Sequence, residues 1–194
     1  MKADYISPQV WKTLYSQMNY ENALAIRLSL ETGLRIGDVV SLPLTSLNGT
    51  EINYTASKTG KGGVCTISAD LARRLKTVSF GGFLFPGREA GKHRTRQAVY
   101  KDLKIVAKRL GVKAHVSPHS ARKTYAVTEY KTRGLKAVQR ELQHDREETT
   151  LIYALADKIT ESLIPSRSLD DESTVERVAQ RVVELLTEKL GVKS

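Results

Sequence analysis

Cysteine is almost absent from this 194-residue sequence, in which Cys65 is the single example. One thiol forms no intramolecular disulfide and no cysteine-rich zinc site, so a disulfide-stabilised secreted scaffold is excluded. Long apolar runs are also missing: none approaches the roughly 18 residues that a membrane-spanning helix needs, and the first ten residues lack the apolar core of a signal peptide. These absences predict a soluble protein of the reducing cytoplasm with no membrane partner.

Acidic residues are scarce in the middle of the chain, which carries most of the excess positive charge. The formal net charge is +10, from 31 Lys and Arg against 21 Asp and Glu. Residues 88–140 contain fifteen of these bases and only three acids, whereas residues 160–194 contain seven acids and five bases. Basic residues often do no more than solvate helix faces, but an imbalance this steep favours a nucleic-acid surface in the central region.

Apolar residues at helical spacing, bounded by capping residues, predict a mainly helical fold. A serine followed by a proline opens two of the helices, at Ser7 and Ser117, and Gly33 is placed to end another. The first expected helix begins at Ser7 and has Met18 on its apolar face. The other expected helices cover about 22–31, 36–42 and 69–78, Thr95 to Gly111, Ser117 to about Gly134, and about 135–142, 149–156 and 172–190.

Alternating residues predict one small antiparallel sheet within this helical fold. Residues 51–56 and 63–67 have the strand pattern, and the glycine-containing stretch 58–62 fits the turn between them. Residues 165–171 are typical of a polar linker, and 172–190 have the apolar spacing of an amphipathic helix. We therefore expect an α+β domain over residues 1–160 and an appendage over residues 161–194.

Seven polar or aromatic residues stand out because of the short motifs that contain them. They are Arg35 and Asp38 in TGLRIGDVVSL, Lys58 in SKTGK, His119 and Arg122 in HSAR, and His144 and Tyr153 in LQHDREETTLIY. A His-x-x-Arg motif alone is not specific, since it occurs by chance in many proteins. The order of the motifs is specific, together with the 22 residues from Arg122 to His144 and the nine from there to Tyr153. In these features residues 7–157 resemble the catalytic domain of the tyrosine recombinases, also called phage-type integrases.

The two arginines suit the chemistry that this resemblance implies. Breaking a phosphodiester bond without a metal requires stabilisation of extra negative charge on the non-bridging oxygens. A guanidinium supplies a planar fork of donors and stays charged at all relevant pH values, so Arg35 and Arg122 are the expected pair. Asp38 is expected either as an ion-pair partner of Arg35 or as a residue that orients it. The family often has Glu at this position.

The resemblance assigns the remaining roles. Tyr153 is the expected nucleophile, and Tyr125, one turn after Arg122, is the nearest rival and is expected in the core. His119 would assist removal of the phenolic proton, whose pKa is ordinarily about 10, and His144 would hydrogen-bond the scissile phosphate. Lys58 would protonate the departing 5′ oxygen, with Lys61 as a second candidate in the same turn.

The implied function is site-specific DNA recombination. The enzyme would cleave and rejoin double-stranded DNA through a 3′-phosphotyrosyl intermediate, with no cofactor, metal or ATP, and would assemble on DNA as a tetramer by exchange of C-terminal segments. A prokaryotic, viral or mobile-element origin and a nucleoid-associated location follow from the same resemblance. The alternatives are topoisomerase IB-like relaxation, telomere resolution, and a non-catalytic DNA-binding accessory protein.

One departure from the family concerns the N-terminal side. The family usually places a helical DNA-clamping domain before the catalytic domain, and only 34 residues precede Arg35. We therefore expect either a catalytic-domain fragment or a protein that encloses DNA incompletely.

Overall fold

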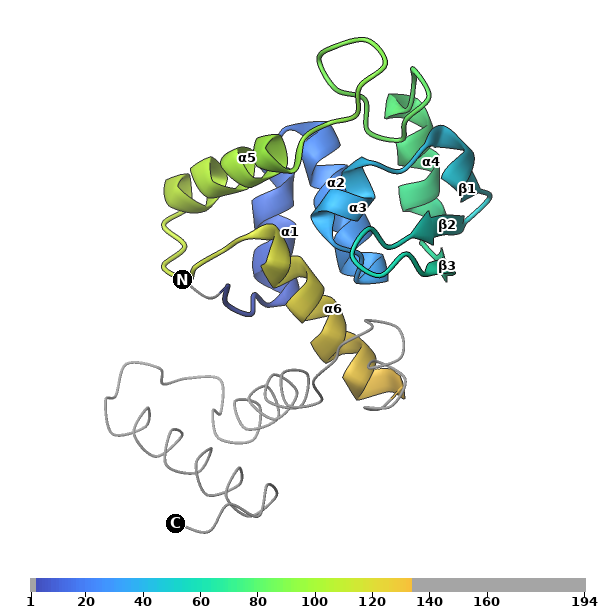
Figure 1. Cartoon of the computed structure of the whole chain (residues 1–194). Coiled ribbons are helices and arrows are strands. Elements are labelled where there is room, and N and C mark those ends of the chain that lie inside the picture. Colours follow the sequence, from blue (N-terminus) through green and yellow to red (C-terminus); the bar gives the residue numbers. More distant parts are fainter. Residues whose placement is uncertain (1–2, 134–194) are drawn as a thin grey trace, which may run out of the picture. The chain divides into compact units, whose positions relative to one another are not determined.

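The computed structural model describes residues 3–133, with side chains up to Glu129, and its compact N-terminal unit extends to Thr128 (Figure 1). The elements in order are α1 (Pro8–Ser16), α2 (Tyr20–Thr32), α3 (Ile36–Val40), the 3-10 helix η1 (Leu44–Ser46), β1 (Leu47–Asn48), β2 (Glu51–Thr55), β3 (Gly62–Thr66), α4 (Ala69–Val78), α5 (Arg96–Arg109) and α6 (Pro118–Arg133). The prediction of a mainly helical fold with a small antiparallel sheet is confirmed. No helix among these residues is long and apolar enough to cross a membrane. The helices predicted after residue 134, the linker and the boundary at residue 160 lie outside the described residues.

Helix α2 is the centre of the unit, and it packs against α1, α3, α4 and α5 (Figure 1). Eight of its thirteen residues are buried, and three of these are polar: Asn22, Ser29 and Thr32. The helix begins two residues earlier than predicted, because the Asn19 side chain accepts a hydrogen bond from the Asn22 backbone N at 3.4 Å. Asp102 of α5 accepts hydrogen bonds from the Asn19 backbone N and from Asn22 Nδ2, at 2.9 and 2.8 Å. This start of α2 therefore also anchors α5.

The sheet has three strands in the order β1-β2-β3, and both pairs are antiparallel. Ile52 of β2 is fully buried and pairs with Leu47 of β1 and Cys65 of β3. The hairpin of β2 and β3 confirms the prediction. Strand β1 was not predicted, since a strand of two residues contains no alternation to detect.

The loop between β2 and β3 is closed by backbone hydrogen bonds. The Ala56 N donates to the Lys61 carbonyl at 2.9 Å, and the Gly60 N donates to the Ala56 carbonyl at 2.8 Å. Gly60 has a φ of 67°, a left-handed conformation that costs little only in glycine. The closed loop presents Lys58 to solvent.

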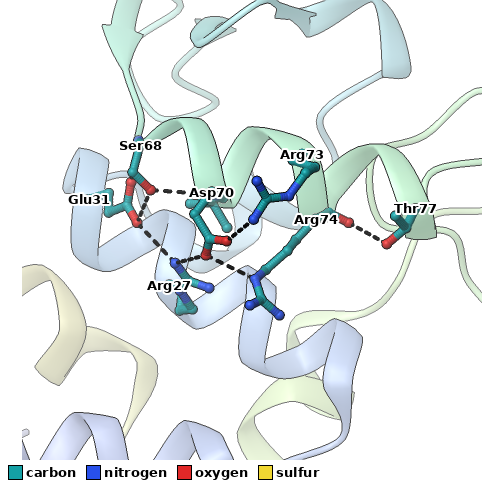
Figure 2. Close-up of polar contacts among 8 residues, drawn as sticks. Arg27, Glu31, Ser68, Asp70, Arg73, Arg74 and Thr77 are labelled. Atoms are coloured by element: carbon teal, nitrogen blue, oxygen red, sulfur yellow. Dashed lines mark hydrogen bonds and ion pairs between the residues drawn. The ribbon is translucent and has the colours of Figure 1, made fainter.

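An ion-pair cluster attaches α4 to α2 (Figure 2). Three guanidinium groups contact the Asp70 carboxylate: Arg27 of α2 at 3.2 Å, and Arg73 and Arg74 of α4 at 2.6 and 2.9 Å. The hydrogen bond from Arg74 is the main cause that lowers the pKa of Asp70, so the carboxylate stays charged. These three arginines are thus engaged within the fold.

Helix α1 and the segment before it pack against α6 through a buried polar network. Trp11, 1% exposed, donates from Nε1 to Thr124 Oγ1 at 2.8 Å, and the Thr124 hydroxyl lies 2.7 Å from the Ile6 carbonyl to which it donates. Asp4 and His115 are joined twice: the Asp4 N donates to the His115 carbonyl, and the His115 N donates to Asp4 Oδ2. The start of the described chain therefore holds α6 and the loop before it.

Candidate active site

A cavity of about 390 Å³ lies where α3, the β2–β3 hairpin, α5 and α6 meet. It is lined by Arg35, Ile36, Gly37 and Asp38 at α3, Ser57 after β2, Arg96, Gln97 and Tyr100 of α5, and Ser117, Pro118, His119 and Arg122 at α6. Four of the seven predicted site residues therefore surround one cavity, although they are separated by as many as 87 positions in the sequence.

The turn after α2 positions both arginines. Gly33 ends α2 with a φ of 68°, and its backbone N donates to the Ser29 carbonyl at 2.9 Å. The Ser29 hydroxyl donates to the Leu34 carbonyl at 2.8 Å and so holds the backbone directly before Arg35. Arg35 is the N-cap residue of α3. On the other side of the turn, Arg122 Nη1 donates to the Gly33 carbonyl at 2.6 Å. One buried turn thus presents Arg35 and also holds Arg122.

Helix α6 supplies the other wall of the cavity. His119 and Arg122 are three residues apart, so they share a face, as predicted from the HSAR motif. Ser120 and Ala121, between them, are fully buried, and Thr124 belongs to the network with Trp11. The buried face of α6 therefore turns His119 and Arg122 toward the cavity, where His119 keeps an exposed edge and Arg122 is half-buried.

The positive charges of Arg35 and Arg122 act on each other at this cavity. The pKa of Arg122 is lowered to about 10, first by burial and then by the positive charge of Arg35, while Asp38 acts in the opposite direction. At neutral pH Arg122 remains charged. Two cations whose mutual repulsion is incompletely compensated favour an anionic ligand between them, because the ligand would relieve that repulsion.

His119 is predicted to be neutral at pH 7. Burial lowers its pKa below the ordinary 6.5, and the charges of Arg122, Arg35 and Lys123 lower it further. Because the unfolded chain then takes up a proton at a higher pH than the folded chain does, stability should fall as the pH drops through 6.5 toward the folded-state pKa. An NMR titration of the His119 ring should give a midpoint below 6.5. A midpoint at or above 6.5 would contradict this electrostatic description of the cavity.

Asp38 is buried, at 4% exposed, and its hydrogen-bond partner is Ser57. Oδ1 of Asp38 accepts from the Ser57 backbone N at 3.2 Å and from the Ser57 hydroxyl at 2.5 Å. Asp38 was expected either to pair with Arg35 or to orient it. Among the described residues the ion pair between Asp38 and Arg35 is not found. Its negative charge instead acts on Arg122.

The remaining predicted residues lie elsewhere. Lys58 and Lys61 are exposed on the hairpin loop, and neither lines the cavity, although Ser57 beside Lys58 does. His144 and Tyr153 lie outside the described residues. Within residues 3–133, no three His, Cys, Asp or Glu side chains cluster as metal ligands would.

Sequence reasoning did not assign Ser57, Arg96, Gln97 or Tyr100 to the site. Thr95 is a recognisable cap, and its hydroxyl accepts from the Ala98 N at 3.1 Å, so the first turn of α5 was predictable. The direction in which that turn faces was not, because it depends on the packing of α5 against α2.

Comparisons with known proteins show which family this chain belongs to. The chain belongs to the Phage integrase family, whose sequence model matches residues 4–159. Tyrosine recombinase XerD of Rhizobium meliloti (strain 1021) is 32% identical over 141 residues, which make up 66% of this chain and 45% of that protein. This chain therefore spans less than half the length of that relative. The resemblance drawn from the motifs is confirmed.

Solved structures show the same fold. The XerH site-specific recombinase in its post-cleavage complex with a palindromic difH substrate has a TM-score of 0.65 and 19% identity, over 81% of this chain and 52% of that chain. The lambda integrase tetramer bound to a Holliday junction has a TM-score of 0.65 and 17% identity, over 76% of this chain and 48% of that chain. At these identities the likeness concerns the fold.

Proposed function

We propose that this chain is a site-specific DNA recombinase that cleaves and rejoins DNA strands through a covalent tyrosine intermediate. The observation that carries the proposal is the cavity in which Arg35 and Arg122, held by the same turn, face a common space beside His119. Two guanidiniums with one buried carboxylate nearby suit a phosphodiester better than a neutral ligand. Membership of the Phage integrase family supports the same substrate class.

The proposed reaction exchanges one phosphoester bond for another. The Tyr153 oxygen forms a bond to phosphorus while the bond from phosphorus to the 5′ oxygen breaks, and a 3′-phosphotyrosyl link results. The phenolic proton leaves toward His119, which is neutral and can accept it, and Lys58 gives a proton to the departing 5′ oxygen. Attack by a second 5′ hydroxyl reverses these steps. Since the bonds formed and broken are of the same kind, the exchange needs no external energy source.

Arg35, Arg122 and His144 would stabilise the phosphate during this exchange. The charge that develops on the non-bridging oxygens would lie between the two guanidiniums, whose repulsion it relieves. The basic residues of 88–140 would hold the flanking backbone phosphates, which makes binding steeply dependent on salt.

Trapping of the covalent intermediate tests the proposal. The full chain is incubated, with a chelator present, with a pool of nicked duplexes that have a randomised core, so that the short cleaved fragment diffuses away and religation fails. We expect DNA that remains bound to protein after denaturation, and mass spectrometry should map the link to the peptide that contains Tyr153. No adduct with any duplex, or an adduct that forms only after Mg²⁺ is added, would overturn the mechanism.

The family match and the likeness to XerD and XerH favour recombination over relaxation. A topoisomerase would relax supercoiled plasmid that carries no selected site, whereas we expect relaxation only where a selected site is present. A non-catalytic DNA-binding protein would give no adduct at all.

Because the proposed substrate is DNA, we also propose that the chain is located in the cytoplasm at the nucleoid. Imaging of a fluorescent fusion together with a DNA stain tests this location.

We further propose that the chain assembles on DNA as a tetramer by exchange of C-terminal segments. The apolar spacing of 172–190 after a polar linker, and the tetramer formed by lambda integrase on a Holliday junction, support this. Deletion of residues 168–194 should leave single-site cleavage intact but abolish the paired complex in a native gel. A truncated chain that loses its thermal unfolding transition would show that the segment folds onto its own chain instead.

A further inference from the structure

Ser57 is an exposed residue whose backbone N and hydroxyl both donate hydrogen bonds to the buried carboxylate of Asp38. Asp38 is 4% exposed, and both of the hydrogen bonds that it accepts at Oδ1 come from Ser57. The 2.5 Å separation between the Ser57 hydroxyl oxygen and Oδ1 is within the range of charge-assisted O–H···O⁻ hydrogen bonds, which are stronger than neutral ones. The negative charge that accepts these bonds also acts on Arg122. The contact therefore connects the hairpin to the electrostatics of the cavity.

Ser57 lies at the start of the hairpin loop, directly before Lys58, so its hydrogen bonds to Asp38 affect where Lys58 is placed. Ser57 is the first residue of the exposed stretch 57–62, and its neighbour Ala56 is buried and closes the loop by hydrogen bonds with Lys61 and Gly60. These backbone hydrogen bonds close the loop around Ala56, and the Ser57–Asp38 hydrogen bonds attach it to α3. Lys58 follows directly, so the place from which its side chain extends is fixed by that attachment.

We propose that Ser57 is a positioning residue that holds Lys58 at the site by attaching the hairpin loop to Asp38. This inference rests on the proposed strand cleavage and adds to it a residue that neither the motifs nor the family match assign. Lys58 is exposed and lies outside the cavity lining, so in the proposed role the position of its backbone decides whether its ammonium group reaches the cavity. Ser57, which does line the cavity, is the residue that directs it.

The proposed role predicts which step a Ser57 substitution affects. In cleavage, the Tyr153 oxygen bonds to phosphorus, the bond from phosphorus to the 5′ oxygen breaks, and Lys58 protonates that oxygen. A misplaced Lys58 slows the departure of the 5′ oxygen but leaves the attacking oxygen and the phosphate contacts unchanged. A duplex with sulfur at the 5′ bridging position releases a thiolate instead, and a thiol has a pKa of about 8.5, so its departure needs no proton donor.

The test measures the cleavage rates of the full chain on matched oxygen and sulfur duplexes of a selected site. Ser57→Ala should slow cleavage of the oxygen duplex by about 10- to 100-fold, the range expected when a catalytic group is misplaced by about an ångström. It should cleave the sulfur duplex at the wild-type rate. Ser57→Thr, which keeps the hydroxyl, should restore the oxygen rate. Ser41→Ala is the matched control, since Ser41 is an exposed serine that donates to the Asp38 backbone carbonyl and lies outside the cavity.

The outcomes separate this inference from the proposed function. Equal slowing of both duplexes by Ser57→Ala would show that Ser57 acts on the fold or on the phosphate, and wild-type rates on both would show that it does nothing. Either result overturns the inference while the proposed function stands. Absence of any adduct with the wild-type chain overturns both. A slowed oxygen duplex with a normal sulfur duplex supports the inference, and Ser57→Ala should then add nothing in an Asp38→Ala background, which lacks the acceptor of both Ser57 hydrogen bonds.

Discussion

The Tyr153→Phe chain should bind selected duplexes as tightly as the wild type but should form no covalent adduct, a loss of at least about 10⁴-fold in cleavage rate. Phenylalanine keeps the ring and removes only the oxygen that would bond to phosphorus, so the change should affect bond formation and not DNA binding. The cavity residues would still bind the phosphate, but no protein nucleophile would be present to attack it. Denaturing gels measure the adduct, and fluorescence anisotropy at fixed salt measures binding.

Two further tyrosines serve as controls for this prediction. Tyr20 is 46% exposed at the start of α2 and outside the cavity, so Tyr20→Phe should cleave at the wild-type rate. Tyr125 is the nearest rival to Tyr153 in the sequence, but it is only 5% exposed, and a nucleophile must reach the DNA backbone. An adduct that persists in Tyr153→Phe and disappears in Tyr125→Phe would overturn the assignment.

The Arg35→Gln chain should show opposite changes in activity and stability. Cleavage falls by about 10²- to 10³-fold, as expected when one donor to a developing oxyanion is removed. The unfolding midpoint of the free protein rises by about 2–4 °C, because the substitution removes a repulsion of the order of 1 kcal/mol with Arg122. Within the described part of the chain Arg35 makes no hydrogen bond or ion pair that the change would break. Scanning calorimetry without DNA measures the midpoint.

Arg122→Gln is the matched control for that prediction. It removes the same charge repulsion, but it also removes the 2.6 Å hydrogen bond from Arg122 Nη1 to the Gly33 carbonyl. Loss of this bond leaves a buried acceptor in the turn and offsets the gain. The midpoint should therefore not rise, although cleavage falls as much. A lower midpoint in Arg35→Gln would show that Arg35 is a structural residue.

Local signals in the sequence predicted most of the helical elements. Ser7, Ser68 and Thr95 each accept a hydrogen bond from the amide three residues later, as the cap-plus-periodicity pattern indicates. Such bonds join residues that are near in sequence, so the sequence alone contains the needed information. Two helix ends differ from the prediction. Helix α3 ends at Val40 rather than at residue 42, and helix α2 begins at Tyr20, directly after its cap Asn19, rather than at about residue 22.

Four of the residues that line the cavity were singled out from the sequence, but the contacts that hold them were not predicted. Arg35, Asp38, His119 and Arg122 line one cavity, and their catalytic roles, like those of His144 and Tyr153, stay predictions. The partner of Asp38 was not predictable, because Ser57 is 19 residues away and only the packing of the hairpin on α3 brings the two together. For the same reason no local pattern indicates that Arg122 contacts the Gly33 turn.

The network around Trp11 and Thr124 affects how this protein should be handled in the laboratory. Residues 4–6 contact His115 and Thr124 on either side of the residues that display His119, and Lys123 donates to the Ala3 carbonyl. A purification tag fused directly to the N-terminus, or a cut that removes the first six residues, would disturb these contacts and thereby the cavity wall. A long flexible spacer between tag and Met1 avoids this, and rates from chains trimmed within residues 1–6 are not comparable with rates from chains that keep these residues.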